Sequence, residues 1–278
     1  MIPAPIGDAA PGNAGQVVNT GFVVTSDGIV VIDSGAHHAH GNAIIAAVQA
    51  VSSQPIRLLI NTHPHPQNVL GNSAFADLGI PILATQATRD AMATRCPQCL
   101  KSLADSVGAD IMAGTRIRLP DRVQAGEQLR VGDRTLRLLH YGHGHTEGDL
   151  VVLDEATQVL FSGDLIYRAQ IPHLSEADSA GWLTALDAVA RLPFRILVPG
   201  RGPAGNAEIL ADMHRYLDDL RQSVSTAYAG GLTVEESITL AGQPAYSHWH
   251  GYDTRHGRNI QHVYFELERH DFLQADGR

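Results

Sequence analysis

The chain has 278 residues, of which 44% are hydrophobic, so it can bury a full core as one large domain or as a domain with an appendage. Its net charge of −9 and the lack of any Lys/Arg-rich run argue against nucleic acid as a partner. Its longest apolar runs, such as Leu58–Ile60 and Leu150–Leu153, have at most the length of a strand, so we expect no membrane span.

Residues 1–15 are rich in Pro, Ala and Gly, which predicts a flexible N-terminal arm. These residues lack the basic start and apolar core of a signal peptide. The arm is either an ordinary mobile terminus or the exposed start of an exported mature protein to which Met1 was added. The sequence leaves both readings open.

The first half of the chain has a mixed α and β pattern. Gln16–Thr25 and Gly28–Ser34 are β-rich, and Gly41–Ser52 has apolar residues at helical spacing. Ile56–Ile60 reads as a buried strand that leads directly into a loop with His63. Loops at the ends of strands are where α/β proteins place their chemistry.

The same mixture continues after a helical stretch at Thr88–Val107. The predicted strands are Gln128–Val131, Thr135–Tyr141, Asp149–Leu153, Gln158–Phe161 and Arg195–Val198. Helices are predicted over Ala180–Arg191, over Asn206–Ala229, from Thr233 onward and over His256–His270.

Three separated segments carry residues of the kind that bind metals. They are Asn61-Thr62-His63-Pro64-His65-Pro66-Gln67-Asn68, Gly144-His145-Thr146-Glu147-Gly148-Asp149 and Phe161-Ser162-Gly163-Asp164-Leu165. Three neutral imidazoles and a carboxylate are a normal zinc set. We therefore expect His63, His65, His145 and Asp164 to bind a metal.

These segments resemble the T-H-x-H-x-D-H and G-H-T-x-G-D motifs of the metallo-β-lactamase superfamily. The resemblance covers about Val17 to Glu268 and implies a four-layer αβ/βα sandwich, an α/β fold with the metal site at one edge of its two sheets. We expect this domain over residues 16–230 and a C-terminal helical extension, packed on it, over residues 231–278.

Three positions depart from the family pattern, and all of them belong to the second of its two metal sites. Gln67 and Asn68 stand where the family has Asp-His, and Arg201 stands where it has a late histidine. Arginine cannot deprotonate to bind a metal, but its guanidinium could pair with Asp164. The pattern predicts a site that has lost its second metal and keeps the first.

The resemblance implies a hydrolase with one Zn²⁺ per chain, other divalent metals being possible, that acts on an ester, thioester or lactam-type bond of a small molecule. The candidate catalytic residues are Asp164, Gln67 and Arg201. Gln67 takes the place of the aspartate that holds the nucleophile, and Asp164 is the better base because an amide cannot accept a proton. The alternative is a metal-bearing binding protein that kept the scaffold without turnover.

Within the superfamily, the chain looks most similar to the zinc metallohydrolases associated with quinoprotein relay and sulfur oxidation. The similarity lies in Asn61–Pro66 followed by Gly71-Asn72, in the helix with Trp182, and in Arg255–Asn259. Those proteins are typically exported, so a periplasmic or secreted location is expected, with a cytoplasmic one left open.

Two further groups of residues have ordinary explanations. Both cysteines lie in Cys96-Pro97-Gln98-Cys99, where a small disulfide or two plain thiols are favoured over a redox centre. Two histidine clusters are expected to be solvated or hydrogen-bonded loop residues rather than a second metal site or a pocket wall. They comprise His37, His38 and His40, and His248, His250 and His256.

Overall fold

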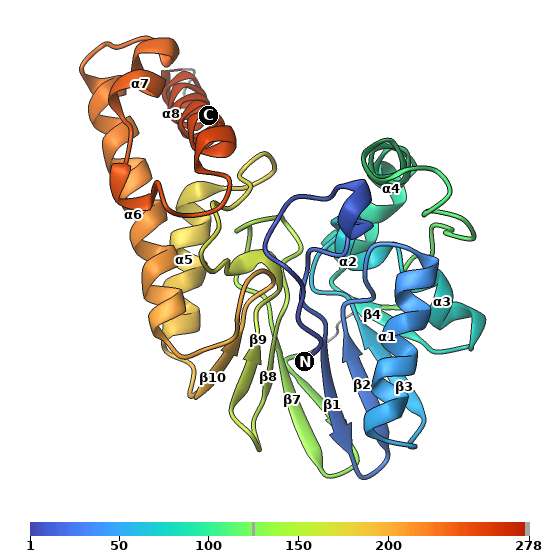
Figure 1. The fold of residues 1–278 in the computed structure, drawn as a ribbon. Helices are drawn as coiled ribbons and strands as arrows, with labels where there is room; N and C mark the ends of the chain where they lie inside the picture. The colour runs from blue at the N-terminus through green and yellow to red at the C-terminus, as the bar shows by residue number, and fades with distance from the viewer. Residues whose placement is uncertain (124–125, 276–278) are drawn as a thin grey trace.

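The computed structural model describes residues 1–123 and 126–275 and contains two five-stranded sheets that pack face to face. Helices cover the outer face of each sheet, as Figure 1 shows. The strand order is β1-β2-β3-β4-β5 in one sheet and β10-β9-β8-β7-β6 in the other. The four-layer αβ/βα sandwich that the sequence predicted is therefore confirmed.

The first sheet is mostly parallel. Its strands are β1 (Gly21–Thr25), β2 (Gly28–Ile32), β3 (Ile56–Ile60), β4 (Ile82–Ala84) and β5 (Arg122–Val123). Only β1 and β2 pair in antiparallel fashion. The helices on this side are α1 (His38–Val51), α2 (Pro66–Val69), α3 (Asn72–Asp77) and α4 (Gln86–Val107).

The second sheet is mostly antiparallel. Its strands are β6 (Gln128–Val131), β7 (Arg134–Leu139), β8 (Val151–Asp154), β9 (Val159–Phe161) and β10 (Ile196–Val198). β9 and β10 are parallel because helix α5 (Ser179–Ala190) crosses between them. Their carboxyl ends consequently lie at the same edge of the sheet.

The strands read as continuous apolar runs because both faces of each sheet are buried. In β2, Val30 and Ile32 point into the core between the sheets, whereas Ile29 and Val31 pack in the cluster that includes α1. All four are at most 2% exposed. This two-sided burial is what a sheet covered by helices requires.

The C-terminal helices form a layer on α5. They are α6 (Glu208–Ala229), α7 (Val234–Leu240) and α8 (Gly257–Ala275), with a π-helical turn, η4 (Tyr252–His256), before the last. The predicted helix start at Thr233 is confirmed: Thr233 and Glu236 form a reciprocal capping box. No helix in the described part of the chain is long and apolar enough to cross a bilayer.

The N-terminal arm contacts the segment before β1 and the turn before α8. The Ile2 N–H donates to the carbonyl of Thr20 at 2.8 Å. The carboxylate of Asp8 pairs with Arg255, close to the start of α8. The flexibility of residues 1–15 and the domain boundaries stated above stay predictions.

Candidate metal centre

The four expected ligands come from three loops at one edge of the sandwich. His63 and His65 follow β3, His145 lies between β7 and β8, and Asp164 lies in the 3-10 helix η2 (Gly163–Leu165) after β9. One donor atom from each of these residues lies within 4.8 Å of all the others. Within the described residues this is the single group of that kind.

His63 and His145 are each oriented by a hydrogen bond at the ring nitrogen that faces away from the group. Nδ1 of His63 lies 2.9 Å from the Thr62 hydroxyl, and Nδ1 of His145 lies 3.1 Å from the carbonyl of His173. Such partners fix the ring orientation and raise the basicity of the nitrogen on the other side. The Nε2 atoms of both rings therefore point inward.

His65 is oriented by Glu176, which lies in the loop before α5. Its Nε2 lies 3.6 Å from Glu176, and Glu176 also pairs with Arg95 on α4. The contact with His65 and the charge of Arg95 lower the pKa of Glu176 to about 2, so it stays ionised. The inward Nδ1 of His65 lies 2.9 Å from Nε2 of His145.

The donor set fits a metal ion. Among the described residues, neither Nε2 of His63 nor Oδ1 of Asp164 has a hydrogen-bond partner, although both atoms are buried. Buried polar atoms are rarely left unpaired, so each such case needs an explanation. Ligands around tetrahedral zinc stand about 3.4 Å apart, a spacing that small side-chain adjustments would give this group.

The imidazoles are already in the protonation state that a metal needs. Burial lowers the pKa of His63 to about 3 and lowers the pKa of His145 well below its ordinary value. Both rings are therefore neutral near pH 7. Metal binding to these two rings would release no proton.

Asp164 is held by two neighbours. Its Oδ2 accepts from Nε of Arg201 and from the Tyr167 hydroxyl, each at 2.9 Å. Burial alone would raise the pKa of Asp164, but the Arg201 guanidinium holds it well below its usual range. Asp164 and Arg201 meet because they follow the parallel strands β9 and β10, so the contact expected from the sequence is present.

The contact depends on Gly200, which lies directly before Arg201. A Cβ atom at this position would stand 2.2 Å from Oδ1 of Asp164. No side chain fits at that distance from a carboxylate held on its other side by Arg201. The glycine therefore permits the close approach of the two loops.

A second buried carboxylate, Asp33, supports the loop of His63 and was not found from the sequence. It accepts from the Thr62 N–H and hydroxyl, both at 2.8 Å, and from the Asn68 amide at 2.9 Å. Burial raises its pKa to about 7, against these hydrogen bonds. Asp33 has a φ of 63°, an uncommon conformation for a residue other than glycine.

Two residues that the sequence singled out form no hydrogen bond or ion pair with the four ligands among the described residues. Gln67 is half-buried on α2, and among the described residues no hydrogen bond or ion pair joins it to the four ligands. Asn68 is buried and turned to Asp33. The structure thus brings Arg201 into the site, whereas Gln67 makes no hydrogen bond or ion pair there among the described residues.

The two cysteines and the first histidine cluster lie in or at the start of helices. Cys96 and Cys99 are free thiols on α4. His37 caps α1 by accepting from the His40 N–H at 3.1 Å, and Nδ1 of His38 lies 3.2 Å from the Ser73 hydroxyl. These histidines are hydrogen-bonded, as expected, but they lie at a helix start rather than in a loop.

The second histidine cluster is spread over different environments. His256 is buried, stacks on Tyr252 with ring centroids 4.7 Å apart, and lies 3.2 Å from the hydroxyl of Tyr216. His248 packs edge-on to Trp249. His250 is exposed and lies 4.0 Å from Asp8. None of them joins the metal-type group found in the described chain.

Comparison with known proteins identifies the family of this fold and site. Residues 14–201 match the metallo-beta-lactamase superfamily, and the chain belongs to it. A metallo-beta-lactamase type 2 from Bacillus sp. (strain 170) is 26% identical over 209 residues, which are 73% of this chain and 72% of that protein. The match to the family ends before α6, so the C-terminal helical layer lies outside it.

Solved structures show the same fold at low sequence identity. A metallo-beta-lactamase from Pontibacter korlensis has a TM-score of 0.60 and 23% identity, covering 71% of this chain and 85% of that one. FIM-1 from Pseudomonas aeruginosa, solved in a mono-zinc form, has a TM-score of 0.57 and 20% identity, covering 71% and 81%. The finer resemblance to quinoprotein-relay hydrolases stays a prediction.

Proposed function

We propose that this protein is a metal-dependent hydrolase that holds one zinc ion with His63, His65, His145 and Asp164. The observation that carries the proposal is the largely buried group of four donors, in which Nε2 of His63 has no hydrogen-bond partner among the described residues. When bound, the ion supplies a water of lowered pKa and polarises the bond that is attacked. The same scaffold serves relatives named as metallo-beta-lactamases.

Asp164 and its partners define the second part of the proposal. Arg201 and Tyr167 both hold Oδ2 of Asp164, which lies 3.9 Å from Nε2 of His63, and Oδ1 has no hydrogen-bond partner among the described residues. Because Arg201 holds the pKa of this carboxyl low, Asp164 is a poor proton acceptor. We therefore assign it to metal binding and orientation, in preference to the base role that the sequence suggested.

Arg201 supports a single metal. It places a permanent positive charge beside Asp164, where a second cation would also seek that carboxylate. A mono-zinc form of this fold exists in FIM-1. We propose an ester, thioester or lactam-type bond of a small molecule as the target, because acyl transfer can proceed with one metal.

Hydrolysis of a panel of 4-nitrophenyl esters, acyl thioesters and a chromogenic cephalosporin tests this function. We expect the zinc-loaded protein to turn over at least one class, and we expect chelation or His63→Ala to abolish the reaction. His38→Ala is the matched control, because His38 lies outside the ligand group.

A different result would favour the alternative function. Tight zinc binding with no turnover on any class, together with small molecules that raise the melting temperature, would indicate a metal-bearing binding protein. Two observations favour this alternative: the lowered pKa of Asp164, and the absence of a hydrogen bond or ion pair between Gln67 and the ligands among the described residues.

A further inference from the structure

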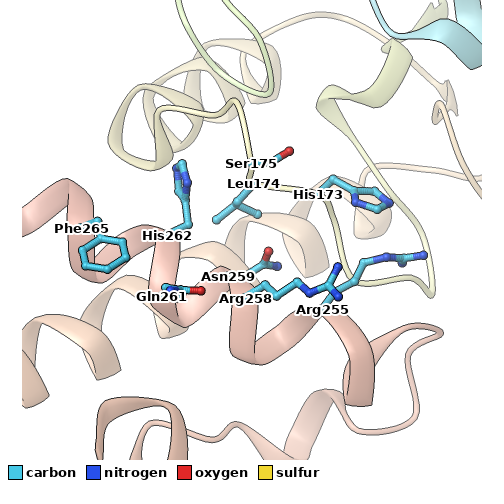
Figure 2. A pocket seen from close by; sticks show the side chains of 9 residues that line it. All are labelled: His173, Leu174, Ser175, Arg255, Arg258, Asn259, Gln261, His262 and Phe265. Carbon is cyan, nitrogen blue, oxygen red and sulfur yellow. The ribbon is translucent and has the colours of Figure 1, made fainter. Parts of the chain in front are cut away.

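A cavity of about 370 Å³ lies between the loop that carries His173 and helix α8, as Figure 2 shows. The side chains of His173, Arg255 and Arg258 lie at one end of it, and His262 and Phe265 lie at the other. None of the described residues that line it carries a carboxylate. The cavity is therefore a basic pocket in a chain whose net charge is −9.

Arg255 already holds a carboxylate at the edge of this cavity. Its side chain is only 5% exposed, and its guanidinium donates to the carbonyl of Ile171 at 3.1 Å and pairs with Asp8. His173 and His250 lie 3.8 Å and 4.0 Å from the same carboxylate. Arg255 thus already binds a carboxylate at this position, with two histidines close by.

Arg258 has no such partner. It is exposed, and no hydrogen bond or ion pair is found for its side chain within the described chain. It lies one helical turn after Arg255, and burial together with the nearby charge of Arg258 lowers the pKa of Arg255 to about 10. An anion between the two guanidinium groups would relieve their repulsion.

The cavity adjoins the metal centre through one residue. The carbonyl of His173 faces Nδ1 of His145, while the side chain of His173 lines the cavity. A molecule bound against Arg258 therefore lies on the other side of the segment that orients a proposed metal ligand.

We propose that this cavity binds the carboxylate of an anionic substrate, whose bond to be cleaved reaches the metal centre past His173. This inference rests on the proposed hydrolase function for its substrate, though not for the binding itself. Asp8 occupies part of the same donor set and competes with the substrate carboxylate. Part of the site comes from α8, outside the region that matches the superfamily.

Binding of glutarate tests the cavity directly, with its neutral diamide, glutaramide, as the comparison at constant ionic strength. We expect glutarate alone to bind the zinc-loaded protein in calorimetry, and we expect chelation to leave this binding in place. Arg258→Gln should weaken it roughly tenfold, the scale of one charge-assisted hydrogen bond. Arg130→Gln, an exposed arginine on β6, is the matched control and should have no effect.

Asp8→Asn should change the affinity for glutarate in the opposite direction from Arg258→Gln. Removing the competing carboxylate should tighten glutarate binding, although Arg255 loses its partner. Equal affinity in the wild type and in Arg258→Gln would overturn the proposal, as would glutarate binding that disappears on chelation. Unchanged affinity for glutarate in Asp8→Asn would show that the Asp8 carboxylate does not compete with the substrate carboxylate.

Kinetics separate this inference from the proposed function. Arg258→Gln should raise KM for mono-(4-nitrophenyl) glutarate and leave KM for 4-nitrophenyl butyrate unchanged, with kcat unaffected for both. If neither ester is cleaved, the hydrolase proposal loses support while the glutarate titration still decides the cavity. Equal effects on both esters would contradict a carboxylate site.

Discussion

The Arg201 guanidinium lies 2.9 Å from the Asp164 carboxylate, and the two side chains are 5% and 0% exposed. Removing one member of a buried ion pair leaves the other charge without compensation. Arg201→Ala should therefore lower the free energy of unfolding of the metal-free protein by about 3–5 kcal/mol. Arg201→Lys should recover part of this loss, because lysine keeps the charge but lacks the planar group.

Urea unfolding after chelation measures this effect. Arg215→Ala is the control, because Arg215 forms an exposed pair with Asp212 at 3.2 Å and should contribute at most about 1 kcal/mol. Equal stability of Arg201→Ala and the wild type would mean that Arg201 does not compensate Asp164.

The number of metal ions follows from the ligand set. Protein purified without added metal and then dialysed against zinc should contain one equivalent per chain by elemental analysis. His63→Ala and His145→Ala should each lose this equivalent, since each removes an inward nitrogen. Two tightly held equivalents in the wild type would contradict the single site.

Tyr167 should influence metal affinity without binding the metal. Its hydroxyl donates to Asp164 at 2.9 Å, so Tyr167→Phe should weaken zinc binding about 10–100-fold, as expected for partners of metal ligands. Competition with a chromogenic chelator measures this affinity. Tyr228→Phe removes a comparable hydrogen bond to exposed Asp271 and should leave zinc affinity unchanged. A matching loss in both variants would speak against the role of Tyr167.

Restoring the family pattern should create a second metal site. The triple variant Gln67→Asp, Asn68→His and Arg201→His should bind two equivalents of zinc, whereas the double variant that keeps Arg201 should bind one. The triple variant should also be less stable, because Asn68 no longer donates to Asp33. One equivalent at saturating zinc would show that the loop with Gln67 has diverged too far.

The docking of α8 should depend on pH through His262 and Glu266, which lie 3.0 Å apart on this helix. Glu266 accepts from the Ser179 N–H at 2.9 Å, and Nε2 of His262 lies 3.0 Å from the carbonyl of Ala177. Against the effect of burial, Glu266 raises the pKa of His262 above 6.5 and His262 helps to lower that of Glu266 below 4.5. The contribution of His262 is complete below about pH 6.5 and is lost as the pH rises through its raised pKa. The contribution of Glu266 is present above about pH 4.5 and is lost at lower pH.

Unfolding of the wild type and of His262→Gln across the pH range checks this dependence. The difference in unfolding free energy should be largest between about pH 4.5 and 6.5 and should shrink on both sides. A difference that does not change with pH would exclude the ion pair as its source.

The elements with a strong periodic pattern were predictable from the sequence. The helix expected at Thr88–Val107 and the strand expected at Ile56–Ile60 are α4 and β3. β4 and β5 were missed, because three and two residues are too short to show a period of two. The short helices α2 and α3 were missed for a similar reason: their form depends on tertiary packing.

The order of the motifs along the chain predicted the four metal-binding residues, but it did not predict the side chains that support them. The contact of Arg201 with Asp164 was expected from the family pattern. Asp33 and Glu176 carry no motif, and they lie beside the ligand loops only because distant segments meet at one sheet edge. Tyr167 lies just three residues after Asp164, but no sequence pattern marked it as a partner. The positive φ of Asp33 was likewise not predictable from the sequence.

The expected metal ligands come from both sheets, so a bound ion would also affect how firmly the two sheets are held together. His63 and His65 lie in a loop that follows β3 of the first sheet, whereas His145 and Asp164 lie in loops that follow β7 and β9 of the second sheet. A bound ion would act as a cross-link between the two halves of the sandwich, and its binding energy would add to their cohesion. Chelation should then loosen the halves as whole units, and amide hydrogen exchange should rise at this rim before it rises in the strands.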